Sequence, residues 1–263
     1  MIVGQHIPGT SYLHRSSAVA KIIFAFCFIP LVFLANNATT NIFLLLFTFF
    51  ALASSKLPIR YVLKGLRPIL FLIVFTFIIQ LLFTREGAVL FEFGWFKIYE
   101  EGLRLAIIVS LRFFYLVSIT TLVTLTTSPI ELTDAIELLL KPFKVVRVPT
   151  HEIALMLSIS LRFLPTLAEE TEKIMKAQQA RGVDLSAGPI KERLRAIIPL
   201  LIPLFISAFK RAEDLATAME ARGYRGGEGR TRLRESKWTG RDTGLMLLLV
   251  VLGLLLVYLR GGF

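Results

Sequence analysis

The chain has 263 residues, of which 55% are apolar, and its formal net charge is +11. The apolar share exceeds the ~45 to 50% that is usual for soluble domains and is gathered into long runs, which excludes an ordinary soluble protein. The chain has one cysteine, Cys27, which excludes an intramolecular disulfide.

Five apolar stretches are long enough, alone or with their flanks, to cross a membrane as helices. A bilayer core requires about 20 mostly apolar residues, with a range of roughly 17 to 25. The stretches cover residues 20–35, 38–55, 68–83, 103–125 and 244–259. The first run lacks a small-x-small cleavage pattern, so it is interpreted as a retained span rather than a signal peptide.

Lysine and arginine in the short connections predict the orientation of these spans, because positive connections stay in the cytoplasm. The connection between the second and third spans has four bases and no acid, whereas residues 84–102 contain more acids than bases. The N-terminus is therefore expected inside. The chain then divides into four spans with their loops over 1–125, a cytoplasmic region over 126–242, and a last span over 243–263.

Helix signals predict three helices in the cytoplasmic region. The stretch Ser128-Pro129-Ile130-Glu131 supplies an N-cap, a proline at the first helical position and an acid in the first turn, so a short helix is expected to about residue 140. A second helix is expected from about residue 149 to Arg181. A third is expected from about residue 189 to Arg222, with Pro199 and Pro203 bending it.

Both long helices have an apolar first half and a charged second half. An apolar run of about 14 residues is too short to span a bilayer and is typical of a buried or interfacial segment. We therefore expect both helices to be anchored at the membrane by their first halves, with their second halves in the cytoplasm.

The same short pattern ends both helices: AQQARG over residues 177–182 and AMEARG over residues 218–223. One copy would be interpreted as an ordinary helix cap, because glycine accepts positive φ past a helix end and arginine meets the negative end of the dipole. Two copies favour a pair of docking ends, since arginine can pair bidentately with a carboxylate. The candidate residues are Ala180, Arg181, Gly182, Ala221, Arg222 and Gly223.

With these motifs the sequence resembles EcfT, the family of transmembrane coupling components of energy-coupling factor (ECF) transporters. The matching stretches are LHR at 13–15, TTSP at 126–129, LRFLP at 161–165, AQQARG at 177–182, AMEARGY at 218–224 and RT at 230–231. The resemblance covers nearly the whole chain. After LHR, where the family has a Leu-Asp-Pro-Arg-Thr-Lys-like run, this chain has SSAVAK and shares only Lys21.

The resemblance implies an all-α membrane protein of about five transmembrane helices and three cytoplasmic or interfacial coupling helices. It also implies a non-catalytic subunit of an importer for a vitamin or transition-metal ion in the prokaryotic plasma membrane. Each motif would dock into one of two ATP-binding-cassette (ABC) ATPases, with Arg181 and Arg222 as contact residues. The apolar halves of the helices would support a small substrate-binding membrane protein, the S component.

Two other functions stay open at this point: the permease subunit of an ordinary ABC transporter, and a membrane scaffold that recruits a soluble partner. The chain is not expected to be an enzyme, because it has no phosphate-binding Gly-x-x-x-x-Gly-Lys-Ser/Thr and the predicted spans contain no acid. No cofactor or metal site is expected, since the three histidines are scattered. No nucleic-acid partner is expected, because the basic residues of the cytoplasmic region are nearly balanced by acids.

Two arginines fall within apolar segments. Arg112 lies inside the fourth span, where a charge is costly and is either functional or paired within the bundle. Arg162 lies in the apolar half of the first long helix, over residues 149–181, and can extend to lipid headgroups. Neither is assigned to the site.

Overall fold

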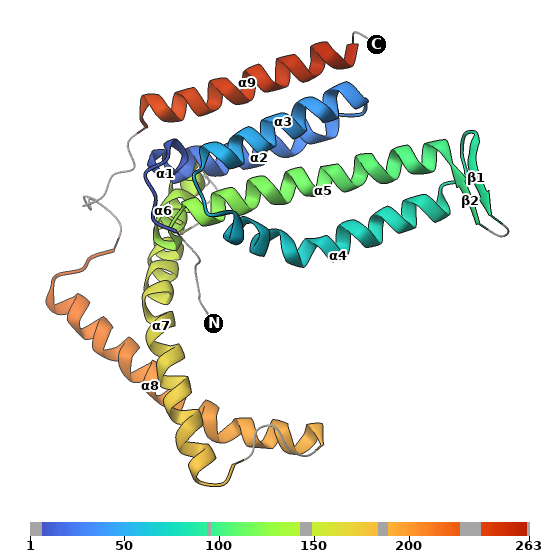
Figure 1. The fold of residues 1–263 in the computed structure, drawn as a ribbon. Helices are drawn as coiled ribbons and strands as arrows, with labels where there is room; N and C mark the ends of the chain where they lie inside the picture. Colours follow the sequence, from blue (N-terminus) through green and yellow to red (C-terminus); the bar gives the residue numbers. More distant parts are fainter. Residues whose placement is uncertain (1–6, 94–95, 143–148, 184–188, 227–237, 262–263) are drawn as a thin grey trace. The chain divides into compact units, whose positions relative to one another are not determined.

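The computed structural model describes residues 7–93, 96–142, 149–183, 189–226 and 238–261, and they are almost entirely helical (Figure 1). Two compact units divide the chain. One covers residues 136–235, and the other covers residues 2–135 with 236–263. The expected division at residues 125/126 and 242/243 stays a prediction.

The larger unit contains one short helix, five longer ones and a two-stranded sheet. Its elements are α1 (Tyr12–Arg15), α2 (Ala18–Leu34), α3 (Ala38–Ser54), α4 (Ile59–Phe83), β1 (Val89–Phe93), β2 (Phe96–Tyr99), α5 (Glu100–Thr126) and α9 (Gly240–Gly261). The strands form an antiparallel hairpin between α4 and α5, which the sequence patterns did not predict. Helix α6 (Pro129–Leu140) runs across the boundary between the units, and α7 (Thr150–Ala180) and α8 (Ile190–Ala221) belong to the smaller unit.

Five apolar helices form at the positions of the five expected spans, and they differ in length. Within the described residues, α4, α5 and α9 are long and apolar enough to cross a membrane, whereas α2 and α3 are apolar but have 17 residues each. Seventeen residues extend about 25 Å at 1.5 Å per residue, which is at the lower limit for a span. The expected all-α membrane class is confirmed.

The helices also extend beyond the predicted apolar runs, which themselves contain no acid. Asp242 lies in the first turn of α9, and Glu100 and Glu101 lie in the first turn of α5. Acids stabilise a helix N-terminus, so the first turn tolerates them even where the rest of the helix is apolar.

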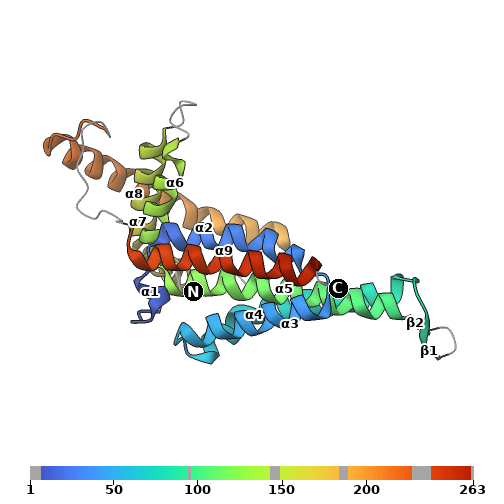
Figure 2. The same cartoon turned by 90° about the horizontal axis from the view of Figure 1, so that it is seen from above.

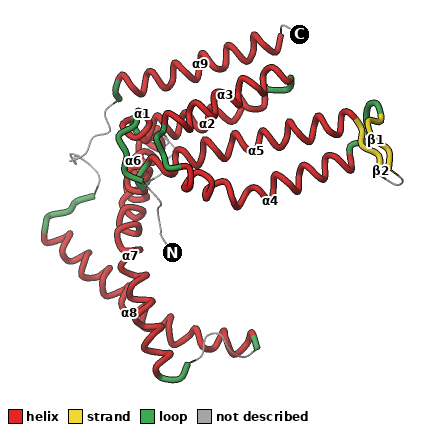
Figure 3. Tube along the Cα trace, in the orientation of Figure 1, coloured by secondary structure: helices red, strands yellow, loops and turns green. Residues whose placement is uncertain are grey.

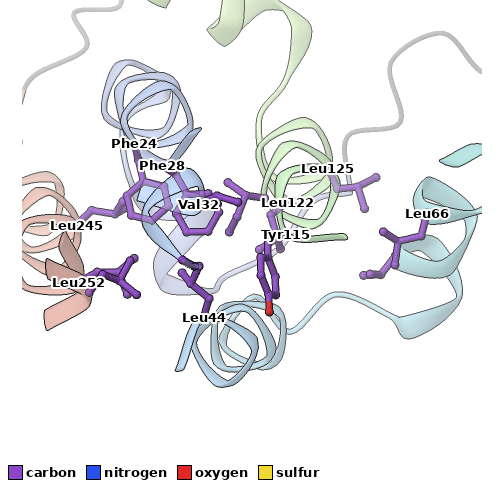
Figure 4. Packing of buried hydrophobic residues seen from close by; sticks show 14 of the residues in the cluster. Phe24, Phe28, Val32, Leu44, Leu66, Tyr115, Leu122, Leu125, Leu245 and Leu252 are labelled. Atoms are coloured by element: carbon purple, nitrogen blue, oxygen red, sulfur yellow. The ribbon is translucent and has the colours of Figure 1, made fainter. Parts of the chain in front are cut away.

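The core of the larger unit forms where α2, α3, α5 and α9 meet (Figure 4). Phe24 and Phe28 are one helical turn apart on α2, so both rings point to the same side of the helix. Their centroids are 6.0 Å apart, and Phe47 of α3 stacks against both. Tyr115 of α5 is fully buried, and its hydroxyl donates a hydrogen bond of 2.8 Å to the carbonyl of Asn41. Aromatic stacking and one satisfied hydroxyl thus join α2, α3 and α5.

Two buried charges fix helix ends in this unit. The ammonium of Lys21 on α2 donates to the Thr126 carbonyl at 2.9 Å and to the Thr127 hydroxyl at 3.3 Å, so it caps the end of α5, where backbone carbonyls lack helical partners. The carboxylate of Asp242 on α9 accepts from the Ser17 backbone N–H at 2.7 Å and from the N–H and hydroxyl of Thr239 at 2.8 Å each. Asp242 therefore holds the start of α2 against the start of α9.

Arg112 is paired within the bundle. Its guanidinium donates to the Asn36 side-chain oxygen at 2.7 Å and lies 5.3 Å from the ring centroid of Phe33. This contact holds the turn between α2 and α3 beside the middle of α5. Helix α5 continues from Arg112 for twelve residues, about 18 Å, to Glu100. The α4–α5 pair consequently extends past this turn, as Figure 1 shows.

We expect Asp242→Ala to lower the stability of the protein by about 2 kcal/mol, because the backbone N–H groups of Ser17 and Thr239, at the starts of two helices, lose a buried, charged acceptor. Thermal unfolding of the purified protein in detergent measures this loss as a drop of several degrees in the midpoint. Asp214→Ala, which removes an exposed carboxylate from α8, is the matched control. Equal midpoints for the two variants would contradict the role of Asp242.

Candidate functional site

The smaller unit is built on α7 and α8, which run antiparallel and cross (Figure 3). Their contacts establish the direction, because Glu170 of α7 lies opposite Ser207 and Arg211, whereas Gln178 further along α7 lies opposite Pro199, which is earlier in α8. The apolar first half of α7 consequently faces the charged second half of α8. They enclose a groove of about 590 Å³ lined by residues such as Leu155, Phe163, Leu215 and Met219.

Prolines in α8 create one of these contacts. Pro203 has no N–H, so the carbonyl of Pro199 four residues earlier loses its helical partner. The side-chain amide of Gln178 donates to that carbonyl at 3.5 Å. Helix α8 changes direction along its length (Figure 1), as the two prolines predict. Gln178 belongs to the first motif, so this contact connects the motif to the bent part of α8.

The Glu170–Arg211 ion pair is the main polar contact between the two helices. The Glu170 carboxylate accepts from Arg211 at 2.8 Å and from the Ser207 hydroxyl at 2.6 Å, and the ion-paired side chains are only about one quarter to one third exposed. Partial burial reduces the screening of an ion pair by solvent, so this contact is stronger than a surface pair.

The position of this ion pair relates the two motifs to each other. Arg181 follows Glu170 by eleven residues, and Arg222 follows Arg211 by eleven residues. Eleven residues make about three helical turns and about 16 Å. The Cα atom of each motif arginine therefore lies on nearly the same side of its helix as the ion-pair residue eleven positions before it. The Glu170–Arg211 contact therefore lies at the same distance along each helix from the motif arginine at its end.

The two helix ends have the same backbone geometry. Arg181 has φ −85° and ψ 6°, and Arg222 has φ −86° and ψ 5°. Gly182 and Gly223 follow with φ of 87° and 73°, in the left-handed region that favours glycine. This is the Schellman arrangement, in which two backbone N–H groups satisfy the last free carbonyls of the helix.

The hydrogen bonds of the two ends match one for one. In the first end, Gly182 donates to Gln179 at 3.0 Å and Val183 donates to Gln178 at 3.0 Å. In the second end, Gly223 donates to Glu220 at 2.8 Å and Tyr224 donates to Met219 at 3.0 Å. The repeated sequence therefore forms a repeated structure that presents each arginine from an equivalent backbone.

Both arginine ends, Ala180–Gly182 and Ala221–Gly223, are exposed at every residue. Space is open around the glycines, since a Cβ on Gly182 or Gly223 would meet nothing within 4 Å. No hydrogen bond or ion pair joins either guanidinium to another described residue. The structure does not bring Arg181 and Arg222 into one pocket, so the six candidate residues make two separate sites, each able to offer a planar guanidinium to a carboxylate.

An apolar face covers the first half of α8. Its exposed side chains are Ile197, Ile198, Leu201, Ile202, Phe205, Ile206 and Phe209. A contiguous apolar surface of this kind marks a contact with a membrane or with another protein. The smaller unit thus combines two polar arginine ends with one apolar contact face.

The sequence patterns did not identify the Glu170–Arg211 ion pair. A signal was available, because an acid and a base stand at the same distance before the two motifs. The antiparallel contact between the helices was needed to show that these opposite charges meet.

The expected start of α6 did form as predicted, since Ser128 and Glu131 exchange hydrogen bonds of 3.0 and 3.3 Å.

The fold and the paired helix ends define a helical membrane protein of several apolar helices with a crossed helix pair that presents two arginines. The chain matches the CbiQ family, described as cobalt transport protein, over residues 9–233. It is 98% identical over the full length of both chains to the energy-coupling factor transporter transmembrane protein EcfT of Exiguobacterium sibiricum. Two further relatives carry the same name: a Bacillus subtilis protein is 56% identical, and a Listeria innocua protein is 54% identical, each over 99% of this chain and 98% of the relative. The chain belongs to the EcfT family of transporter transmembrane proteins.

We expect the Glu170–Arg211 ion pair to control the distance between the arginine ends. Spin labels on cysteines at the exposed positions Gln179 and Glu220, with Cys27→Ser, report this distance by pulsed double-electron resonance. Glu170→Arg places two like charges at the crossing and should shift or broaden the distance distribution, because the half-buried contact becomes repulsive.

A charge exchange gives the decisive comparison. Glu170→Arg combined with Arg211→Glu should restore the narrow distribution, since the opposite charges face each other again. Glu172→Arg is the matched control, because Glu172 pairs with Lys176 on the exposed side of the same helix. An unchanged distribution in Glu170→Arg would exclude the proposed control by this ion pair.

Proposed function

We propose that this chain is the non-catalytic transmembrane coupling subunit of an ATP-driven ECF-type importer in the prokaryotic plasma membrane. The N-terminus and helices α6 to α8 lie in the cytoplasm, as the distribution of positive charges favours. The duplicated arginine end is the observation that supports this most strongly. Two equivalent, exposed helix ends suit a partner that offers the same acidic groove twice, and a pair of related ATPase subunits has that property.

Each arginine end would dock into one of two ABC-type ATPases. The guanidinium of Arg181 or Arg222 would pair with a carboxylate in the groove, and the exposed glycine after it leaves room for close approach. The motif alanines are small and exposed, so they leave the guanidinium accessible. The chain itself needs no nucleotide site, because ATP is bound and hydrolysed by the partners.

The crossed helices would transmit the movement of the ATPases. When ATP closes the two subunits, the arginine ends approach each other, and the helices turn about the Glu170–Arg211 ion pair. The apolar face of α8, around Phe205, would pass this movement to a small membrane-embedded S component that binds the transported vitamin or transition-metal ion. The substrate is selected by that component.

Two alternatives make different demands. A permease of an ordinary ABC transporter would form the substrate path itself, and it normally offers one coupling helix for each half. Two arginine ends on one chain favour the coupling subunit. A scaffold for a soluble partner gives no reason for the exposed apolar face of α8 beside two matched polar ends.

We expect ATPase subunits and a small membrane protein to co-purify with the chain from native membranes. Arg181→Ala or Arg222→Ala should weaken recovery of the ATPases, and the double variant should abolish it, because each end occupies one groove. Mass spectrometry of the recovered proteins measures this. Lys176→Ala and Arg225→Ala remove exposed positive charges next to the motifs and should leave recovery unchanged. ATPases retained by the double variant would contradict docking through the arginines.

The glycines provide an independent prediction. Gly182→Ala or Gly223→Ala should reduce ATPase affinity roughly 5- to 30-fold, since a residue with a Cβ costs about 1 to 2 kcal/mol in the left-handed conformation that presents the arginine. Titration of purified chain with ATPase measures the affinity. Gly240→Ala, at an open position without positive φ, should bind as the unmodified chain does. Normal binding by both motif variants would show that the cap geometry is not required.

A further inference from the structure

The hairpin of β1 and β2 lies crosswise to α4 and α5 at the ends of these helices (Figures 1 and 2). Its register pairs Phe91 with Ile98 and Glu92 with Lys97. Because neighbouring residues of a strand point to opposite faces, the first pair lies on one face of the hairpin and the second pair on the other. The hairpin is therefore amphipathic.

The polar face is held by an ion pair between Glu92 and Lys97. A hydrogen bond from Lys97 to Glu92 raises the pKa of Lys97, so the ammonium stays charged at neutral pH. Phe91, on the other face, is about half exposed. Val89 and Leu90, where a β-bulge shifts the register, are exposed to a similar extent. A two-stranded hairpin that exposes this much apolar surface to water would be poorly stable.

The base of the hairpin is fixed to the helices. The backbone N–H of Glu100, the first residue of α5, donates to the Ala88 carbonyl at 2.9 Å. Gly87 has φ 89°, which allows the chain to turn from the end of α4 into β1. A Cβ on Gly102 would lie 3.0 Å from the Thr84 carbonyl, so the two helix ends approach closely there. The direction of the hairpin is consequently set by α4 and α5.

We propose that this hairpin is an interfacial element that lies flat at the outer lipid–water boundary, with the Phe91 face toward the acyl chains and the Glu92–Lys97 face toward water. The exposed apolar surface of α4, which leads to the hairpin, supports lipid as the partner of the Phe91 face. Phe75, Leu82 and Phe83 are exposed on α4, so an open apolar surface runs along this helix to the hairpin. Tyrosine and tryptophan are enriched at this depth of a bilayer, and β2 ends in Tyr99.

The polar face agrees with this assignment. Glu92 and Lys97 neutralise each other and leave the hairpin without a net charge on that face that would select a protein partner. The hairpin would also affect the position of the bundle in the membrane. Helices α4 and α5 are longer than α2 and α3, and an interfacial hairpin at their common end would fix how far the pair enters the bilayer.

Tryptophan fluorescence in vesicles can compare the two faces. Trp95 and Trp238 are the two tryptophans of the chain, so Trp95→Phe with Trp238→Phe gives a background without them. Phe91→Trp places a probe on the apolar face, and Lys97→Trp places the matched probe on the polar face. Phosphatidylcholine brominated on its acyl chains quenches from the membrane side, and acrylamide quenches from water.

We expect the brominated lipid to quench Phe91→Trp at least twofold more than Lys97→Trp, and acrylamide to show the reverse order. Equal quenching of the two probes by both agents would overturn the proposal. A second outcome would also overturn the proposal. If lipid quenches Phe91→Trp in the isolated chain but not after co-expression with the proposed S component, this face is covered by protein in the assembly.

Discussion

The ion pair between Glu170 and Arg211 is the contact on which the arrangement of α7 and α8 depends. Two helices of 31 and 32 residues that met only through apolar side chains could slide or rotate against each other. A half-buried carboxylate with two donors within 2.8 Å is directional and fixes one register. Since both arginine ends follow this contact at the same distance along their helices, fixing the crossing also fixes what the molecule offers to a partner.

Buried charge serves a related purpose in the larger unit. Lys21, Arg112 and Asp242 each join helices or turns that are far apart in the sequence, and each does so through backbone groups or an amide near a helix end. In a bilayer, apolar packing gives little preference between one helix arrangement and another, because lipid tails are as apolar as the side chains. Hydrogen bonds to a few ionised groups supply the directional contacts that select one arrangement. Lys21 reaches from α2 to the end of α5 in this way.

The helices of the larger unit differ in length, and this determines where each helix ends along the bundle. Helices α2 and α3 turn beside the middle of α5, where Arg112 meets Asn36, whereas α4 and α5 continue to the hairpin. The short helices α2 and α3 and the long helices α4 and α5 therefore end at different positions along the bundle. At this end of the bundle, exposed apolar residues of α4 such as Phe83 are followed in the chain by the hairpin, whose Glu92–Lys97 ion pair is also exposed.

Much of this protein is determined by local sequence. The apolar runs, the cap at Ser128 and the glycines after both arginines specify the helices and their ends, because helix formation, capping and positive φ depend on residues within a few positions of each other. The repeated motif also identified the two candidate ends. Only the tertiary structure decided that α7 and α8 run antiparallel, that Glu170 meets Arg211, and that Lys21 and Asp242 cap helices more than a hundred residues away. These pairings join distant parts of the chain, and no local propensity selects one distant partner over another. The hairpin escaped prediction for the same reason, since two short strands become stable only when the ends of α4 and α5 hold them together.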